Sequence, residues 1–171
     1  MKKELKFVLS FLIISSILYI LISIFYSKDF PIIGIYSITS TINNILNFID
    51  IRTVIVDNDT IYFSNGVALN IILECTGVYE IIILSSIILS YPTNIKNKLF
   101  GIIFGIIIIY ILNMIRLVSI SYVLVYYTDK FYFIDRYLWQ ISLVVFISLT
   151  YIIWLKMIER PNSLIEQLNS S

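Results

Sequence analysis

Long apolar runs dominate the pattern of the chain and predict four membrane-spanning helices. We expect these helices over residues 7–26, 75–91, 99–127 and 137–158. Runs of about 20 apolar residues are typical of helices that cross the hydrocarbon core of a bilayer, which is about 30 Å thick. The first run is longer than the apolar part of a signal peptide, and no small-x-small cleavage site follows it. We therefore expect it to remain as an uncleaved anchor.

The segment 28–74, between the first two runs, shows two other periodicities. Its first part has apolar residues at helical spacing, namely Ile38, Ile42, Ile45, Leu46 and Ile49. This pattern predicts a short helix that lies in the membrane interface. Further on, β-prone runs flank two polar stretches, Asp57-Asn58-Asp59 and Ser64-Asn65-Gly66. Because Asn-Gly between such runs is a strong hairpin signal, we expect a small antiparallel β-element that leads into the second span.

The composition agrees with a membrane protein. Of the 171 residues, 59% are hydrophobic and 13% are charged, whereas about 25% of residues are charged in soluble domains. We predict an all-α polytopic membrane protein that forms a single membrane domain over residues 1–171, with about four transmembrane helices, an interfacial helix and an extracytoplasmic β-hairpin. The net charge of +1 argues against a nucleic-acid partner, because such partners require clustered cations.

The distribution of cations near the span ends predicts the topology. One side collects seven cations: Lys2, Lys3, Lys6, Lys96, Lys98, Lys156 and Arg160. The other side has four cations diluted by acidic residues: Lys28, Arg52, Lys130 and Arg136, with Asp29, Asp50, Asp57, Asp59, Asp129 and Asp135. We therefore expect both termini and the 93–98 loop in the cytoplasm. The segment 28–74 and the loop 128–136 are expected outside.

The chain contains one cysteine, Cys75, and no histidine. A zinc site of the Cys/His type is therefore excluded, and we expect neither a metal nor another cofactor. Cys75 lies where the second span begins, and a helix N-terminus there would lower the pKa of the thiol and favour the thiolate. Gly77 allows a backbone or a substrate to approach closely. The alternative interpretation is that Cys75 is a small, packed hydrophobic residue.

Arg116 interrupts the third apolar run, three residues after Asn113, so the two share one helix face. An arginine inside a span normally faces a partner or a watery cavity, because inserting it costs about 2.5–3.5 kcal/mol. If the tyrosines at 122, 126 and 127 form the outer aromatic belt, Arg116 lies a turn or two below it, near the level of Cys75. A structural ion pair with Glu80 is the alternative.

Two further charges precede the fourth span. Asp135 and Arg136 lie in the predicted outer loop and can reach the same outer pocket as Cys75 and Arg116. The alternative is ordinary: charged residues often flank a span beside an interfacial tryptophan, here Trp139.

These elements in this order resemble the exosortase/archaeosortase family of membrane transpeptidases. The resemblance covers about residues 54–155 and depends on three stretches: Cys75-Thr76-Gly77, Asn113-Met114-Ile115-Arg116 and Asp135-Arg136-Tyr137-Leu138-Trp139. The family has a basic residue before the last span, which is histidine in exosortases and often arginine in the archaeal branch. A histidine-type register places Asp135 at this position, whereas the archaeal register, which we prefer, places Arg136 there.

The resemblance implies a thiol protease or transpeptidase of the plasma membrane that acts in protein sorting to the cell surface. Its partners would be exported proteins with a C-terminal short motif, a transmembrane helix and a basic tail, and a membrane lipid as a possible acceptor. Cys75 would be the nucleophile, Arg116 would stabilise the thiolate or the oxyanion, and Arg136 would bind the substrate carbonyl. Asn113 would support Arg116, and water, Glu74, Asp135 or a tyrosine would protonate the leaving group. The competing class is a non-catalytic assembly or transport protein with a structural Arg116–Glu80 pair.

Overall fold

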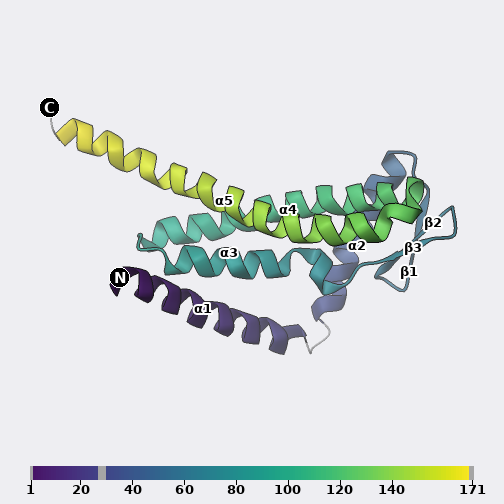
Figure 1. Ribbon diagram of the computed structural model, residues 1–171, viewed down its shortest axis with the longest axis horizontal. Coiled ribbons are helices and arrows are strands. Elements are labelled where there is room, and N and C mark those ends of the chain that lie inside the picture. The colour runs from purple at the N-terminus through teal and green to yellow at the C-terminus, as the bar shows by residue number, and fades with distance from the viewer. Residues whose placement is uncertain (1, 27–29, 170–171) are drawn as a thin grey trace.

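The computed structural model describes residues 2–26 and 30–169, and it places the side chains of 4–24, 34–131, 133–137 and 141–159. Helices account for most of the chain (Figure 1). The α-helices are α1 (Lys2–Tyr26), α2 (Phe30–Phe48), α3 (Val78–Ser90), α4 (Ile95–Tyr126) and α5 (Phe131–Asn169). Two short 3-10 helices, η1 (Leu73–Thr76) and η2 (Thr128–Lys130), precede α3 and α5.

Three stretches of the described helices are long and apolar enough to cross a membrane: Glu4–Ile24 in α1, Ile95–Tyr126 in α4 and Phe133–Glu159 in α5. They confirm the predicted all-α polytopic membrane fold. The predicted span 75–91 differs, because α3 has only 13 residues and is about 20 Å long. The first two residues of the predicted span, Cys75 and Thr76, belong to the turn η1. The helix α4 packs against this turn.

The helices α4 and α5 both begin earlier than predicted. Lys96 and Lys98 belong to the start of α4, and Asp135 and Arg136 to the start of α5, so the predicted loop 128–136 is reduced to η2. The physical reason is that a helix continues into the polar interface, where charged residues end the apolar run without ending the helix.

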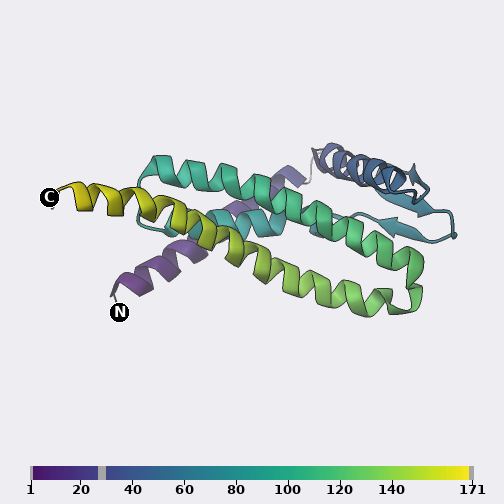
Figure 2. The ribbon, with the colours of Figure 1, turned by 90° about the horizontal axis from the view of Figure 1, so that it is seen from above.

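Different segments of the chain lie at the two ends of the elongated molecule (Figures 1 and 2). The start of α1, the turn between α3 and α4 and the end of α5 lie at one end, and the β-strands and η2 lie at the other. This is the arrangement that the cation count requires. Lys28, Asp29 and the side chains of Lys2, Lys3 and Arg160, which entered that count, lie outside the described residues. The assignment of the first end to the cytoplasm stays a prediction.

The predicted interfacial helix corresponds to α2, which is longer than expected because the helical pattern extends back to Phe30. Its buried apolar residues are Ile38, Ile42 and Leu46, four residues apart, as an amphipathic helix requires. The helix ends where Asp50 adopts a left-handed conformation (φ 62°) and Ile51 N–H donates to the Leu46 carbonyl at 3.0 Å. This arrangement is a typical helix C-terminus.

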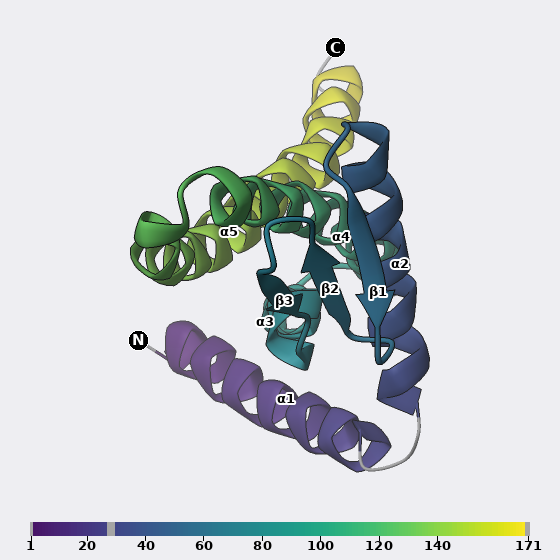
Figure 3. The same cartoon turned by 90° about the vertical axis from the view of Figure 1, so that its right-hand side faces the viewer.

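The predicted hairpin is part of a three-stranded antiparallel sheet of β1 (Thr53–Val56), β2 (Thr60–Phe63) and β3 (Ala68–Asn70), in that order. The Asn-Gly hairpin is confirmed, since it joins β2 to β3 and Gly66 has a φ of 83°. The runs on both sides of the two polar stretches form the three strands, one strand more than a single hairpin has. Figure 3 shows β1 beside α2 and β3 at the opposite edge.

Two apolar clusters hold these elements together. The outer cluster joins α2 and the sheet to α4 and includes Ile42, Ile61 and Leu117. The inner cluster joins α3, α4 and α5 around Trp154, whose indole N–H donates to the Asn97 carbonyl at 3.1 Å. Small residues permit this inner packing, because an added Cβ on the α4 glycine Gly101 would overlap the Trp154 ring. Cys75 borders the outer cluster.

Candidate active site

Cys75 lies in the single turn η1, which joins β3 to α3. The Cys75 N–H donates to the Ile72 carbonyl at 2.9 Å, and the Thr76 hydroxyl donates to the Leu73 carbonyl at 2.6 Å. Because Thr76 is buried, its hydroxyl must find a partner inside the protein, and its own turn supplies one. These bonds hold the Cys75 backbone in one conformation and leave the thiol half-buried.

Gly77 joins η1 to α3 and must be glycine for two reasons. Its φ of 80° lies in the left-handed region, which residues with a side chain rarely adopt. In addition, a Cβ at this position would lie 3.3 Å from Ile109 Cγ2 and 3.6 Å from Asn113 Cβ. The turn that carries Cys75 therefore lies close to the Ile109 and Asn113 side chains of α4 at Gly77, and the expectation that a substrate also approaches there stays a prediction.

Asn113 connects this turn to Arg116. Its side chain is 1% exposed, and its Nδ2 donates to the Cys75 carbonyl at 2.6 Å. Its Oδ1 accepts from Arg116 Nη1 at 3.5 Å, which is long for a hydrogen bond. The three-residue spacing on α4 places both side chains on the helix face that meets η1. One amide therefore contacts both the cysteine backbone and the guanidinium.

Arg116 of α4 is buried, with 5% of the residue exposed. Its charge acts on both Cys75 and Glu80. Glu80 is 2% exposed, and among the described residues its Oε2 has no hydrogen-bond partner. The alternative ion pair is thus present as a charge–charge interaction. Such a counter-charge lowers the free-energy cost of burying the guanidinium.

Cys75 itself lies outside the membrane-spanning helices, in η1. Burial raises the pKa of the Cys75 thiol above its ordinary value, and a backbone hydrogen bond with Ile72 and the charge of Arg116 oppose this rise. The charges of Asp135 and Glu74 add to it. The prediction that a helix N-terminus lowers this pKa is therefore wrong. The physical reason is that the thiol belongs to the 3-10 turn η1, which precedes α3, and that burial removes the thiol from water.

This balance of charges predicts how alkylation of Cys75 depends on pH. Alkylating agents react with the thiolate, so the rate with iodoacetamide should rise with pH and reach its midpoint above that of a solvent-exposed cysteine. Arg116→Gln should move the midpoint up, and Asp135→Asn should move it down. Arg136→Gln is the control, because that charge is not among those acting on the thiol. The same midpoint in all four proteins would contradict the assignment.

The two charged residues of the third stretch, Asp135 and Arg136, differ in their exposure. Asp135 is half-buried in the second turn of α5 and acts on the Cys75 thiol, whereas Arg136 is exposed. Glu74 is exposed in η1 itself. Among these three residues, the charges of Asp135 and Glu74 act on the thiol, and only Asp135 is partly buried. The side chain of Trp139 lies outside the described residues.

Two features of this region have no counterpart in the sequence analysis. Thr76 was noted only as part of a motif, although its buried position inside a polar turn is a signal for a backbone hydrogen bond.

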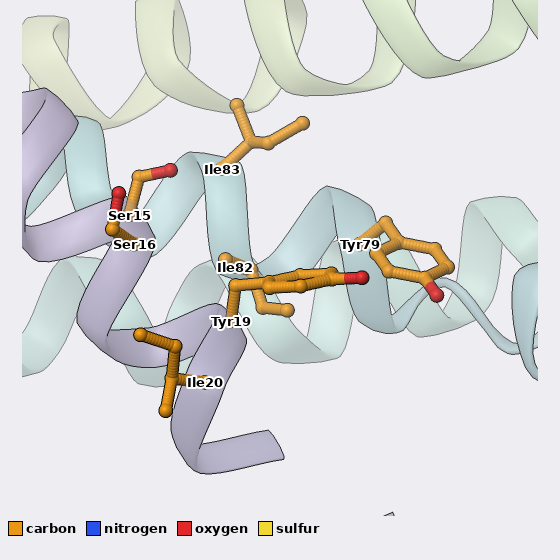
Figure 4. Close-up of a pocket in the computed structure, with 7 residues that line it drawn as sticks. All are labelled: Ser15, Ser16, Tyr19, Ile20, Tyr79, Ile82 and Ile83. Atoms are coloured by element: carbon orange, nitrogen blue, oxygen red, sulfur yellow. The ribbon is translucent and has the colours of Figure 1, made fainter. Parts of the chain in front are cut away.

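The second feature is a pocket of about 460 Å³ between α1 and α3 (Figure 4). Its lining consists of Ser15, Ser16, Tyr19, Ile20, Tyr79, Ile82 and Ile83. The Tyr19 and Tyr79 rings stack there, 6.4 Å apart, and no sequence period reveals such a contact between helices.

Comparison with known proteins identifies one family. A family model described as transmembrane exosortase matches residues 2–156. A search of curated proteins and a search of solved structures find no match to the chain.

Proposed function

Because the chain belongs to the transmembrane exosortase family, we propose that this multi-pass membrane protein is a cysteine transpeptidase. It cleaves the C-terminal sorting signal of exported proteins and transfers them to a lipid or another anchor. The observation that carries the proposal is the contact of Asn113 with both the Cys75 carbonyl at 2.6 Å and Arg116 Nη1 at 3.5 Å. It couples the one cysteine of the chain to a buried guanidinium.

In the first step, the Cys75 thiolate attacks the scissile carbonyl of the substrate. A carbon–sulfur bond forms, the peptide C–N bond breaks, and the departing amine takes up a proton. Arg116 stabilises the thiolate or the negative charge on the tetrahedral oxygen, because a fixed cation away from bulk water acts strongly there. In the second step, a lipid head group, an amine or water attacks the thioester and releases Cys75.

The remaining roles follow from placement. Asn113 holds Arg116 against η1 and is a positioning residue. The thiol proton passes to the carboxylate of Asp135 or Glu74, whose charges act on the thiol, or to water or a tyrosine, and that group returns it to the leaving amine. Arg136, which is exposed at the start of α5, binds the incoming substrate or the acceptor. The site faces the outside of the cell, and the substrate carries a short motif, an apolar helix and a basic tail.

Trapping the acyl-enzyme tests this function. The purified protein is incubated without an acceptor amine together with a tagged exported protein of the same genome that ends in the three-part signal. We expect a covalent adduct that hydroxylamine releases and that mass spectrometry locates on Cys75. An adduct on another residue, or processing of the substrate without any thioester in rapid-quench samples, would contradict the proposal.

A further inference from the structure

The small sheet beside the site has two edges, and the register shows which backbone groups point away from each edge. Phe63 of β2 donates its N–H at 2.9 Å to the carbonyl of Val67, the residue before β3. Hydrogen-bonded pairs alternate along an antiparallel ladder, so Leu69 also exchanges its hydrogen bonds with β2. The N–H and C=O groups of Ala68 and Asn70 therefore point away from the sheet.

The opposite edge is closed by a side chain. On β1, the outward-pointing N–H of Thr53 donates to Asn47 Oδ1 of α2 at 3.1 Å, and the Thr53 carbonyl accepts from Asn47 Nδ2 at 3.3 Å. The amide of Asn47 thus replaces a neighbouring strand. The helix α2 lies beside β1, so this edge is covered where Asn47 meets Thr53 (Figure 3).

The β3 edge has no such cover among the described residues. The outward N–H and C=O groups of Ala68 and Asn70 have no hydrogen-bond partner there, and both residues are exposed. Proteins protect a free edge by keeping the edge strand short, or with lysine, proline, a bulge or a covering segment. The strand Ala68–Asn70 is short, but it has no lysine or proline, and no further strand of the described residues pairs with it. One edge of the sheet is therefore closed and the other is available.

The open edge leads directly to the nucleophile. Cys75 follows Asn70 by five residues in the chain, which span at most about 17 Å in the extended form. A peptide that pairs with β3 therefore has its scissile bond within about five residues of the paired segment. This fits a substrate in which a short extended segment precedes an apolar helix.

We propose that the edge of β3 binds the extended segment of the substrate that precedes its apolar helix, as a fourth strand of the sheet. This inference rests on the function proposed above. Main-chain hydrogen bonds to Ala68 and Asn70 supply the affinity, as in other cases of strand addition, and alternate substrate side chains supply the specificity. The bound strand then delivers the scissile carbonyl to Cys75.

A proline substitution tests the edge without disturbing the sheet. Ala68→Pro removes an N–H that bonds to nothing in β2, and proline is tolerated at an outward position of an edge strand. We expect kcat/KM for the tagged substrate to fall about ten-fold, since one substrate carbonyl loses its partner. The thermal unfolding temperature and the rate of Cys75 alkylation should stay unchanged. Ala68→Val, which keeps the N–H, is the matched control, and equal activity of the two variants would overturn the proposal.

Cross-linking separates this proposal from the proposed function, because it needs no turnover. In an Ala68→Cys/Cys75→Ser protein, single cysteines are placed in turn along the segment before the apolar helix of the tagged substrate. Pairing as a strand predicts disulfides at every second substrate position. Uniform or absent cross-linking would overturn the edge proposal alone. Failure of the wild-type protein to process the substrate would count against the transpeptidase function and leave the cross-linking pattern to decide the edge.

Discussion

We expect Cys75→Ala to reduce cleavage of a tagged sorting-signal substrate by at least about 10⁴-fold, because loss of a covalent nucleophile removes the whole acylation pathway. The thiol is half-buried beside Arg116 and Asn113, and the described residues include no second cysteine that can replace it. Cleavage is measured as the size shift of the tagged substrate in membranes that contain either protein.

The substitution should leave the fold intact. The bonds that shape η1 are made by the Cys75 backbone, which accepts from Asn113 and donates to Ile72, and by the Thr76 side chain. Alanine keeps all of them, so the unfolding temperature should change little. Cys75→Ser is the matched variant, because it restores volume and polarity but provides a poorer nucleophile. Normal processing by Cys75→Ala at wild-type protein levels would end the thiol mechanism and favour a non-catalytic membrane protein.

Much of the fold follows from patterns that the sequence displays directly. Apolar runs longer than the hydrocarbon core predicted α1, α4 and α5, and the Asn65-Gly66 pair predicted a hairpin that the structure contains. The helical spacing of Ile38, Ile42 and Leu46 predicted α2 and its buried face. These signals are local, because period and turn chemistry are decided within a few residues.

The missed features depend on contacts between distant segments. The span predicted at 75–91 is divided into η1, Gly77 and α3, and the turn is held against α4 by a tertiary contact, the hydrogen bond from Asn113 to the Cys75 carbonyl. The direction of the Cys75 pKa shift depends on how much protein covers the thiol, which no local pattern encodes. The closure of β1 by Asn47 likewise depends on tertiary packing.

The site shows the same division. The sequence placed Asn113 and Arg116 on one helix face, and the structure agrees. It preferred Arg136 to Asp135 for the third role, and this choice stays a prediction. In the structure Asp135 is half-buried and its charge acts on the thiol, whereas Arg136 is exposed.

The second large effect is expected at Arg116. We expect Arg116→Lys to lower kcat by about 10²–10³-fold, comparable to the loss of an oxyanion donor, with a smaller change in KM. A lysine keeps the positive charge but is a single point donor, whereas the planar guanidinium bonds Asn113 and stabilises charge at Cys75 from fixed positions. Steady-state cleavage of the tagged substrate measures both constants, and Arg52→Lys, at an exposed position, is the control.

A double substitution separates this catalytic role from charge balance. Arg116→Gln removes the cation whose charge acts on the buried Glu80 carboxyl, which should lower the unfolding temperature. Adding Glu80→Gln removes that carboxyl, so the unfolding temperature should recover. Activity should not recover, because the cation beside Cys75 is still missing. If the double variant regains activity together with stability, Arg116 only neutralises Glu80, and the oxyanion role assigned to it is wrong.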